Sequence, residues 1–179
     1  MAHEEEGLSP GELADKAWQL AEKIRIGMFT TWDGTQQRIR PLTATVDRDA
    51  HAIYFLIGVT GGTTLAAATG APSLTLAEQI ERFPTVTIAF VDQGGSDYVT
   101  ITGEAAVSND REKIRELWTP FAKAWWDSAD DPDIRLVTVR PDNAEIWEGP
   151  NKLVAYAVML TAAATGAKPP VGDHGAVRL

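Results

Sequence analysis

The chain has 179 residues, of which 44% are hydrophobic and 23% charged, and it contains no cysteine. This composition is typical of a globular protein and predicts a single domain over residues 1–179. The lack of cysteine excludes disulfides, thiolate catalysis and cysteine-based zinc or iron–sulfur sites. The formal net charge of −9 disfavours binding to nucleic acid and to anionic membranes.

We expect neither a signal peptide at the start of the chain nor a membrane span near its end. The opening MAHEEEGLSPGEL contains neither the basic nor the apolar region of a signal peptide. The apolar stretch LVAYAVMLTAAATGA near the end is too short to span a bilayer. We therefore expect a cytoplasmic protein with no nucleic-acid and no membrane partner.

The first predicted element is a helix over residues 10–23, after a flexible lead-in at 1–8. Ser9 and Glu12 form the pattern of a capping box, and Pro10 suits the first helical position. Hydrophobic residues then recur at helical spacing, which predicts an amphipathic helix.

Six strands are predicted from runs of hydrophobic and β-branched residues bounded by turn residues. Asp33-Gly34 between the first two runs is a strong hairpin signal, and the first three strands are too close for parallel crossovers. The predicted strands are 26–32, 36–46, 52–57, 86–92, 98–107 and 134–149, the last one bent at Pro141. Antiparallel strands in a chain of this size must protect their edges, which favours a closed or split barrel.

Three further helices and two irregular segments complete the expected order. The helices are predicted at 74–82, at 110–123 with a break at Pro120, and at 152–164. Residues 58–72 form a Gly/Thr/Ala-rich insertion, and residues 166–179 form a C-terminal tail. The fold class is therefore mainly β (α+β), a six-stranded antiparallel split β-barrel with flanking helices.

Arg38 and Arg40 are separated by one residue in the second predicted strand, so their side chains project to the same face. Leu42, Ala44 and Val46 follow on that face. Two guanidiniums beside an apolar run can form an anion site, because the arginine fork matches phosphate oxygens. The same pattern is also typical of a solvated edge strand whose charges discourage aggregation, so both interpretations remain open.

Two compositional features also have more than one interpretation. Three of the six tryptophans lie in one helical region, where they suit packing, a subunit interface or a wall for a flat aromatic ligand. The glycines and threonines of the insertion suit either a surface loop or a backbone nest for an anion. The three histidines show no metal-ligand spacing, and no residue qualifies as a catalytic acid, base or nucleophile, so we expect no metal site and assign no catalytic residue.

Several short motifs occur in order over roughly residues 10–179. They are KIRIGMFTTWDG followed by RIRPL, then AIYFLI, VTIAFVD, YVTITGEAAVSNDREKIRELWTPFAKAWW, and finally NAEIWEGP with GAKPPVGDHGAVRL. Together they resemble the general stress protein branch of the pyridoxamine 5′-phosphate oxidase-like, FMN-binding split barrels.

This resemblance implies a homodimer that binds FMN in each of two clefts between the subunits. Arg40 matches the phosphate-binding arginine of the family, and Trp118 matches a tryptophan of the helix near the cleft. The implied cofactor-binding residues are Arg40, Pro41, Leu42, Phe55, Leu56, Ile57 and Trp118.

The chain departs from the family where a Ser-x-Lys pair usually precedes the short helix. Leu74 and Leu76 occupy these positions, so the phosphate-binding lysine is missing. Losing one charge-assisted contact costs about 1.5–3 kcal/mol, which corresponds to roughly ten- to a hundredfold in affinity. We expect either weak or lost FMN binding, or replacement of the lysine by the insertion, including Thr63 and Thr64.

Three functions are open from the sequence. The first is an FMN-dependent oxidoreductase acting on a small electron donor or acceptor, in which the flavin supplies the redox chemistry. The second is a non-enzymatic flavin-binding, ligand-binding or sensor protein. The third is a reductase that binds the deazaflavin F420, which related split barrels use.

Overall fold

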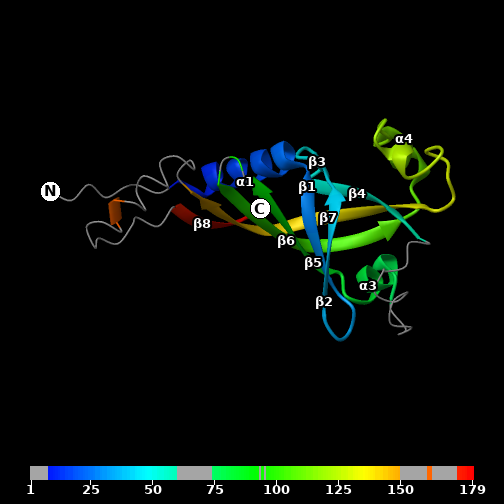
Figure 1. Ribbon diagram of the computed structural model, residues 1–179, viewed down its shortest axis with the longest axis horizontal. Helices are drawn as coiled ribbons and strands as arrows, with labels where there is room; N and C mark the ends of the chain where they lie inside the picture. Colours follow the sequence, from blue (N-terminus) through cyan, green and yellow to red (C-terminus); the bar gives the residue numbers. More distant parts are fainter. Residues whose placement is uncertain (1–7, 60–73, 93, 95, 150–160, 163–172) are drawn as a thin grey trace.

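Eight antiparallel strands form the body of the described part of the chain (Figure 1). The computed structural model describes residues 8–59, 74–92, 94, 96–149, 161–162 and 173–179. The strands are β1 (Ile26–Trp32), β2 (Gln37–Thr43), β3 (Thr45–Asp47), β4 (Ala52–Gly58), β5 (Thr85–Asp92), β6 (Asp97–Ser108), β7 (Ile134–Glu148) and β8 (Asp173–Arg178). The helices are α1 (Pro10–Ile24), α3 (Leu76–Arg82), α4 (Arg111–Glu116) and the 3₁₀ helix η1 (Ala122–Ala124).

The strands form one curled sheet in the order β2-β1-β5-β6-β7-β4-β3, and β8 also pairs with β7. The hairpin predicted at Asp33-Gly34 joins β1 to β2, with Trp32 opposite Gln37 and a positive φ of 98° at Gly34. Glycine adopts this left-handed conformation without steric cost. Because β2 and β3 are the two ends of this order, the sheet leaves an opening along them.

β7 is long enough to pair with two different strands along one edge. Its first half pairs with β4 and its second half with β8, while β6 runs along the other edge. The pairing with β6 shifts between Thr102 and Gly103, next to Pro141, which cannot donate a backbone hydrogen bond. A Cβ atom on Gly103 would lie 2.2 Å from the carbonyl oxygen of Arg140, so the strands approach too closely there for a side chain.

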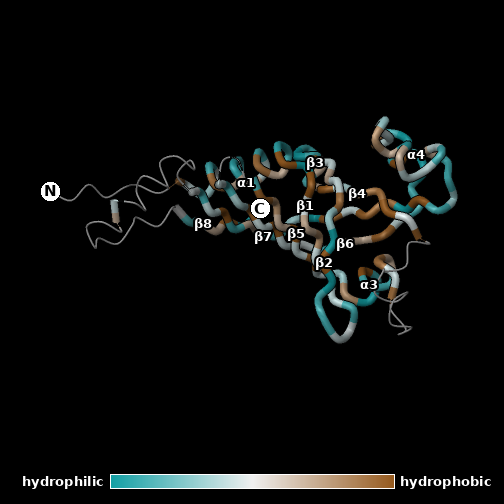
Figure 2. Tube along the Cα trace, in the orientation of Figure 1, coloured by the Kyte–Doolittle hydropathy of each residue, from teal (hydrophilic) through white to brown (hydrophobic). Residues whose placement is uncertain are grey.

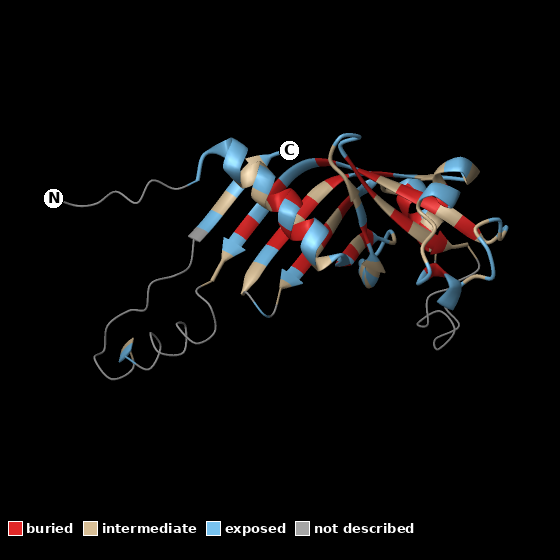
Figure 3. Cartoon of the chain, turned by 90° about the horizontal axis from the view of Figure 1, so that it is seen from above, coloured by how far each residue is buried: buried red, intermediate tan, exposed pale blue. Residues whose placement is uncertain are grey.

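The main core lies between the inner face of the sheet and α1. Buried residues alternate with exposed ones along the strands (Figure 3), and the hydrophobic colour follows the strands while the β1–β2 turn is hydrophilic (Figure 2). Ala17, Trp18 and Leu20 of α1 pack into the same cluster as Phe90 and Ile146. A second, smaller cluster of Ile114, Ile134 and Leu136 lies under α4 and the segment that follows it.

The capping box predicted for the first helix is confirmed, because Ser9 and Glu12 bond each other's backbone groups. The predicted helix over 110–123 is wrong in extent. α4 ends at Glu116, and only η1 follows beyond Pro120, whose ring cannot continue a helix. The helix predicted from residue 74 begins instead at Leu76, because Thr75 caps it.

The count of six strands is also corrected. The predicted strand 36–46 is divided into β2 and β3 at Ala44, whose N–H bonds the carbonyl of Arg25 rather than a neighbouring strand. The segment expected as a tail over 166–179 contributes β8. The insertion at 58–72 beyond Val59, and the predicted helix at 152–164 apart from 161 and 162, lie outside the described residues.

Candidate functional site

A groove of about 1230 Å³ runs along the opening of the sheet, between the edge strand β2 and β4. Because β2 pairs with no strand on its outer side among the described residues, side chains from both of its faces reach the groove. The segment after α4 provides the opposite wall. The lining residues include Arg38, Arg40, Leu42, Tyr54, Leu56, Ile57, Leu76, Phe121, Trp125 and Trp126.

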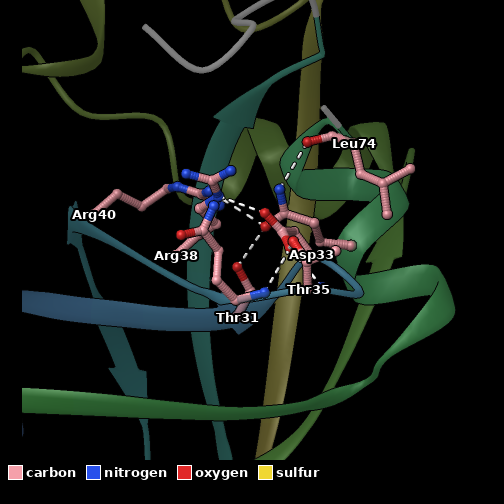
Figure 4. A network of polar contacts seen from close by, with 8 residues as sticks. Thr31, Asp33, Thr35, Arg38, Arg40 and Leu74 are labelled. Atoms are coloured by element: carbon pink, nitrogen blue, oxygen red, sulfur yellow. Dashed lines mark hydrogen bonds and ion pairs between the residues drawn. The ribbon is translucent and has the colours of Figure 1, made fainter. Parts of the chain in front are cut away.

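Arg40 lies at the groove against a buried hydrogen-bond network (Figure 4). Its Nη2 donates to Oε1 of Gln79 at 3.3 Å. Oε1 of Gln79 also accepts from the Thr31 hydroxyl at 2.5 Å, and Nε2 of Gln79 donates to the carbonyl of Leu74 at 2.7 Å. The network joins β1, β2 and α3.

Arg38 lies beside Arg40 but differs in how its charge is balanced. Its Nε donates to Oδ2 of Asp33 at 2.6 Å, and both side chains are largely buried. Oδ1 of Asp33 also accepts from the backbone N–H groups of Thr35 and Gln36 and from the Thr35 hydroxyl. These bonds, led by that of Gln36, hold the pKa of Asp33 well below its usual range, so its charge offsets that of Arg38.

No acidic partner is recorded for Arg40 among the described residues, and its Nη1 is buried there without a hydrogen-bond partner. Burial lowers the pKa of Arg40, and the neighbouring Arg38 lowers it further. An approaching anion counteracts both effects on the pKa, because a nearby negative charge favours the protonated guanidinium. An unsatisfied buried donor of this kind fits a phosphate or carboxylate group.

The rest of the groove is mainly apolar and aromatic. Leu56 and Tyr54 contribute from β4, and the wall after α4 carries the exposed rings of Phe121 and Trp125, with 77% and 80% of their surface accessible. One cationic end and one aromatic wall are suited to a flat ligand that carries an anionic group.

The structure brings together five of the sequence-predicted site residues along this groove: Arg40, Pro41, Leu42, Leu56 and Ile57. Phe55 does not line it, because alternation along β4 turns its ring into the core, edge-on to Phe29. Trp118 packs instead with the second cluster. Thr63 and Thr64 lie outside the described residues.

Sequence reasoning missed Gln79 and did not assign Tyr54, Phe121 or Trp125 to the site. The signal for Gln79 was weak, because it consists only of one polar residue on the apolar face of a short helix. For Trp125 the sequence left a ligand wall and simple packing as alternatives, and the structure places it at the groove.

The chain matches the family model described as pyridoxamine 5′-phosphate oxidase like over residues 12–170, which is most of its length. The chain belongs to this family. In the described part of this family member we find no group of three or more potential metal ligands and no helix long and apolar enough to cross a membrane.

Relatives of this pyridoxamine 5′-phosphate oxidase-like chain include general stress proteins. It is 28% identical to general stress protein 26 of Bacillus subtilis over 79 residues, 42% of this chain, and spans 56% of the relative's length. A structure assigned to general stress protein 26 from Jannaschia sp. CCS1 matches with a TM-score of 0.64 and 24% identity, covering 94% of this chain and 99% of that one. This match confirms the split-barrel fold.

A second solved structure is that of the general stress FMN/FAD binding protein of Xanthomonas citri. It is 26% identical, with a TM-score of 0.60, and the match covers 79% of this chain and 92% of that one.

Proposed function

We propose that the protein binds FMN in the groove and acts as an oxidoreductase on a small electron donor or acceptor. The observation that carries the proposal is the buried Nη1 of Arg40, which has no hydrogen-bond partner among the described residues, at one end of a groove that is mainly apolar and aromatic. Membership of the family and the likeness to a general stress protein described as FMN/FAD binding support it.

The residues present fit a flavin mononucleotide. Arg40 would hold the phosphate by charge-assisted hydrogen bonds. Leu42 and Leu56 would pack against the apolar parts of the cofactor. When bound, the flavin supplies the redox chemistry. The chain's own residues bind and orient it and exclude water, and none of them is assigned a proton-transfer step.

The second part of the proposal is a homodimer with the cofactor cleft between subunits. Seven of the ten exposed large hydrophobic side chains in the described part of the chain fall on the sheet face opposite α1. They are Ile26, Met28, Trp32, Ile39, Val91, Tyr98 and Trp147. An apolar face of this breadth is typical of a subunit interface.

Titration of the purified protein with FMN, riboflavin, FAD and F420, followed by flavin fluorescence, tests the cofactor. We expect FMN to bind more tightly than riboflavin, because only FMN carries the phosphate that Arg40 would contact. Tighter binding of F420 would instead favour the deazaflavin alternative, and no binding of any flavin would overturn the proposal.

The oxidoreductase part needs a second measurement. Bound FMN should lose its visible absorbance when a reduced nicotinamide is added without oxygen and regain it with an electron acceptor. Tight FMN binding without turnover, across donors of different classes, would favour a flavin-binding or sensor protein.

A further inference from the structure

Gln79 is a polar residue at a position of α3 where the sequence pattern predicts a buried apolar residue. It lies on the buried face of α3 with Leu76 and Ile80, and its exposed fraction is 0%. Among the described residues, the one other buried polar side chain is that of Thr31, and its hydroxyl is hydrogen-bonded to Gln79. A buried amide is costly unless its hydrogen bonds are made, so its partners define its role.

The partners of Gln79 fix the orientation of its amide. The guanidinium of Arg40 can only donate, so the atom facing Arg40 must be the carbonyl oxygen Oε1. The backbone carbonyl of Leu74 can only accept, so the atom facing it must be Nε2. A glutamate would place an acceptor against the Leu74 carbonyl, and an apolar residue would satisfy neither partner.

Gln79 orients the Arg40 guanidinium without neutralising its positive charge. Its oxygen takes one hydrogen bond from Nη2, and Nη1 is left buried without a partner in the described part of the chain. Arg38 shows the contrasting arrangement, because Asp33 both holds and offsets its charge. A neutral acceptor therefore orients Arg40 while keeping its positive charge for a ligand.

The position of Gln79 in α3 shows how this helix contributes to the cationic end of the groove. Leu76, at the position where the resemblance implies a phosphate-binding lysine, is apolar and lines the groove. Gln79 is three residues further on in the same helix. α3 therefore contributes to the cationic end through the orientation of Arg40 rather than through a cation of its own.

We propose that Gln79 is a positioning residue that orients the Arg40 guanidinium to bind a phosphate monoester. This proposal rests on the proposed function, because the phosphate is that of FMN. Gln79 itself does not contact the ligand.

The test compares the affinities of FMN and riboflavin for the Gln79→Met variant, which keeps the side-chain volume and removes both hydrogen-bonding groups. Loss of the contact that orients Arg40 should weaken FMN binding about tenfold, and the affinity for riboflavin should be unaffected. Gln79→Glu should weaken FMN at least as much, because its carboxylate offsets the charge of Arg40. Thr31→Val removes a hydrogen bond from the same amide without touching Arg40, so it should weaken FMN binding less than Gln79→Met does.

A double-mutant cycle decides whether Gln79 acts through Arg40. In an Arg40→Ala background, Gln79→Met should cause no further loss of FMN affinity. A further tenfold loss, or equal losses of FMN and riboflavin in the single variant, would show a merely structural role and overturn the proposal.

A measurement without ligand separates this proposal from the proposed function. Nitrogen-edited NMR of the arginine side chains, with Arg40 assigned by its loss in Arg40→Ala, should show distinct Nη–H signals that merge in Gln79→Met as the guanidinium rotates freely. Unchanged signals would overturn the positioning role. Absence of flavin binding by the unaltered protein would overturn the proposed function alone.

Discussion

At the scale of single residues, Arg40 and Arg38 share a strand face but differ in their partners. Arg40 has a neutral partner and an unsatisfied buried Nη1, whereas Arg38 is paired with Asp33. We therefore expect Arg40→Ala to weaken FMN binding by about 1.5–3 kcal/mol, the range for a hydrogen bond to a charged group. The affinity for riboflavin should fall much less, because riboflavin lacks the phosphate.

Isothermal titration of both ligands measures this difference. Arg140→Ala is the control, because Arg140 is an exposed arginine on β7 whose removal changes the net charge equally. Equal losses for FMN and riboflavin in Arg40→Ala would mean that Arg40 supports the fold rather than the phosphate.

Asp33 makes a pH-dependent contribution to stability. Its carboxylate accepts bonds from Gln36, Thr35 and Arg38, which lower its pKa in the folded protein. A depressed folded pKa stabilises the protein above the unfolded value of about 4, and this stabilisation is lost as pH falls below it. Asp33→Asn should therefore unfold more easily at neutral pH, with a difference that shrinks in acid.

Denaturant unfolding at a series of pH values measures this dependence. Asp97→Asn provides a control for the loss of one carboxylate. A difference between Asp33→Asn and the unaltered protein that stays constant from neutral to acid pH would contradict the assignment.

Residue spacing along a strand predicted where the two arginine side chains point, and the resemblance predicted further residues that line the groove. The i, i+2 spacing of Arg38 and Arg40 places both guanidiniums on one strand face, and both line the groove. The same alternation puts Phe55 in the core, although the resemblance implied a place beside the cofactor. Gln79 could not be predicted, because its role depends on contacts with strands more than thirty residues away.

At the scale of secondary structure, α3 depends on its cap. The Thr75 hydroxyl accepts from the backbone N–H of Glu78, whose carboxylate accepts in return from the Thr75 backbone N–H. A helix of seven residues is too short to be stable by itself. Thr75→Ala should therefore lower the free energy of unfolding by about 0.5–2 kcal/mol.

Chemical denaturation of the two proteins measures the difference, and Thr75→Ser should retain most of the stability because it keeps the hydroxyl. Equal stability of the alanine variant and the unaltered protein would show that packing of Leu76 and Ile80, rather than the cap, determines α3.

Elements with strong local signals were predicted well, and elements that depend on distant contacts were not. The first helix and the Asp33-Gly34 hairpin follow from capping and turn residues. β8 carries no comparable local pattern in DHGAVR and forms because β7 offers a free edge beyond β4. The helix ended at Glu116 rather than near Lys123 because Pro120 outweighs the hydrophobic periodicity around it.

At the scale of the whole molecule, the two faces of the sheet differ in whether another element covers them. α1 covers the inner face over β5 to β8, while the opposite face carries a row of exposed hydrophobic side chains. The strand order also leaves the groove open along β2, so the proposed cofactor is only partly enclosed by one chain. A second copy on the exposed face would cover the apolar surface and complete the cleft.

The last prediction tests that assembly with Met28→Glu. Met28 lies near the middle of the exposed face, is 40% accessible and does not line the groove. A glutamate there would be buried without a partner in a dimer but solvated in a monomer, so it should favour the monomer. Leu8→Glu is the matched control, because Leu8 is 45% accessible and directly precedes the cap of α1, the helix that packs on the opposite face of the sheet. Light scattering should find a dimer for the unaltered protein and for Leu8→Glu, and a monomer with weakened FMN binding for Met28→Glu. If the unaltered protein scatters as a monomer at micromolar concentration with FMN present, the cleft is formed by one chain and the dimer is excluded.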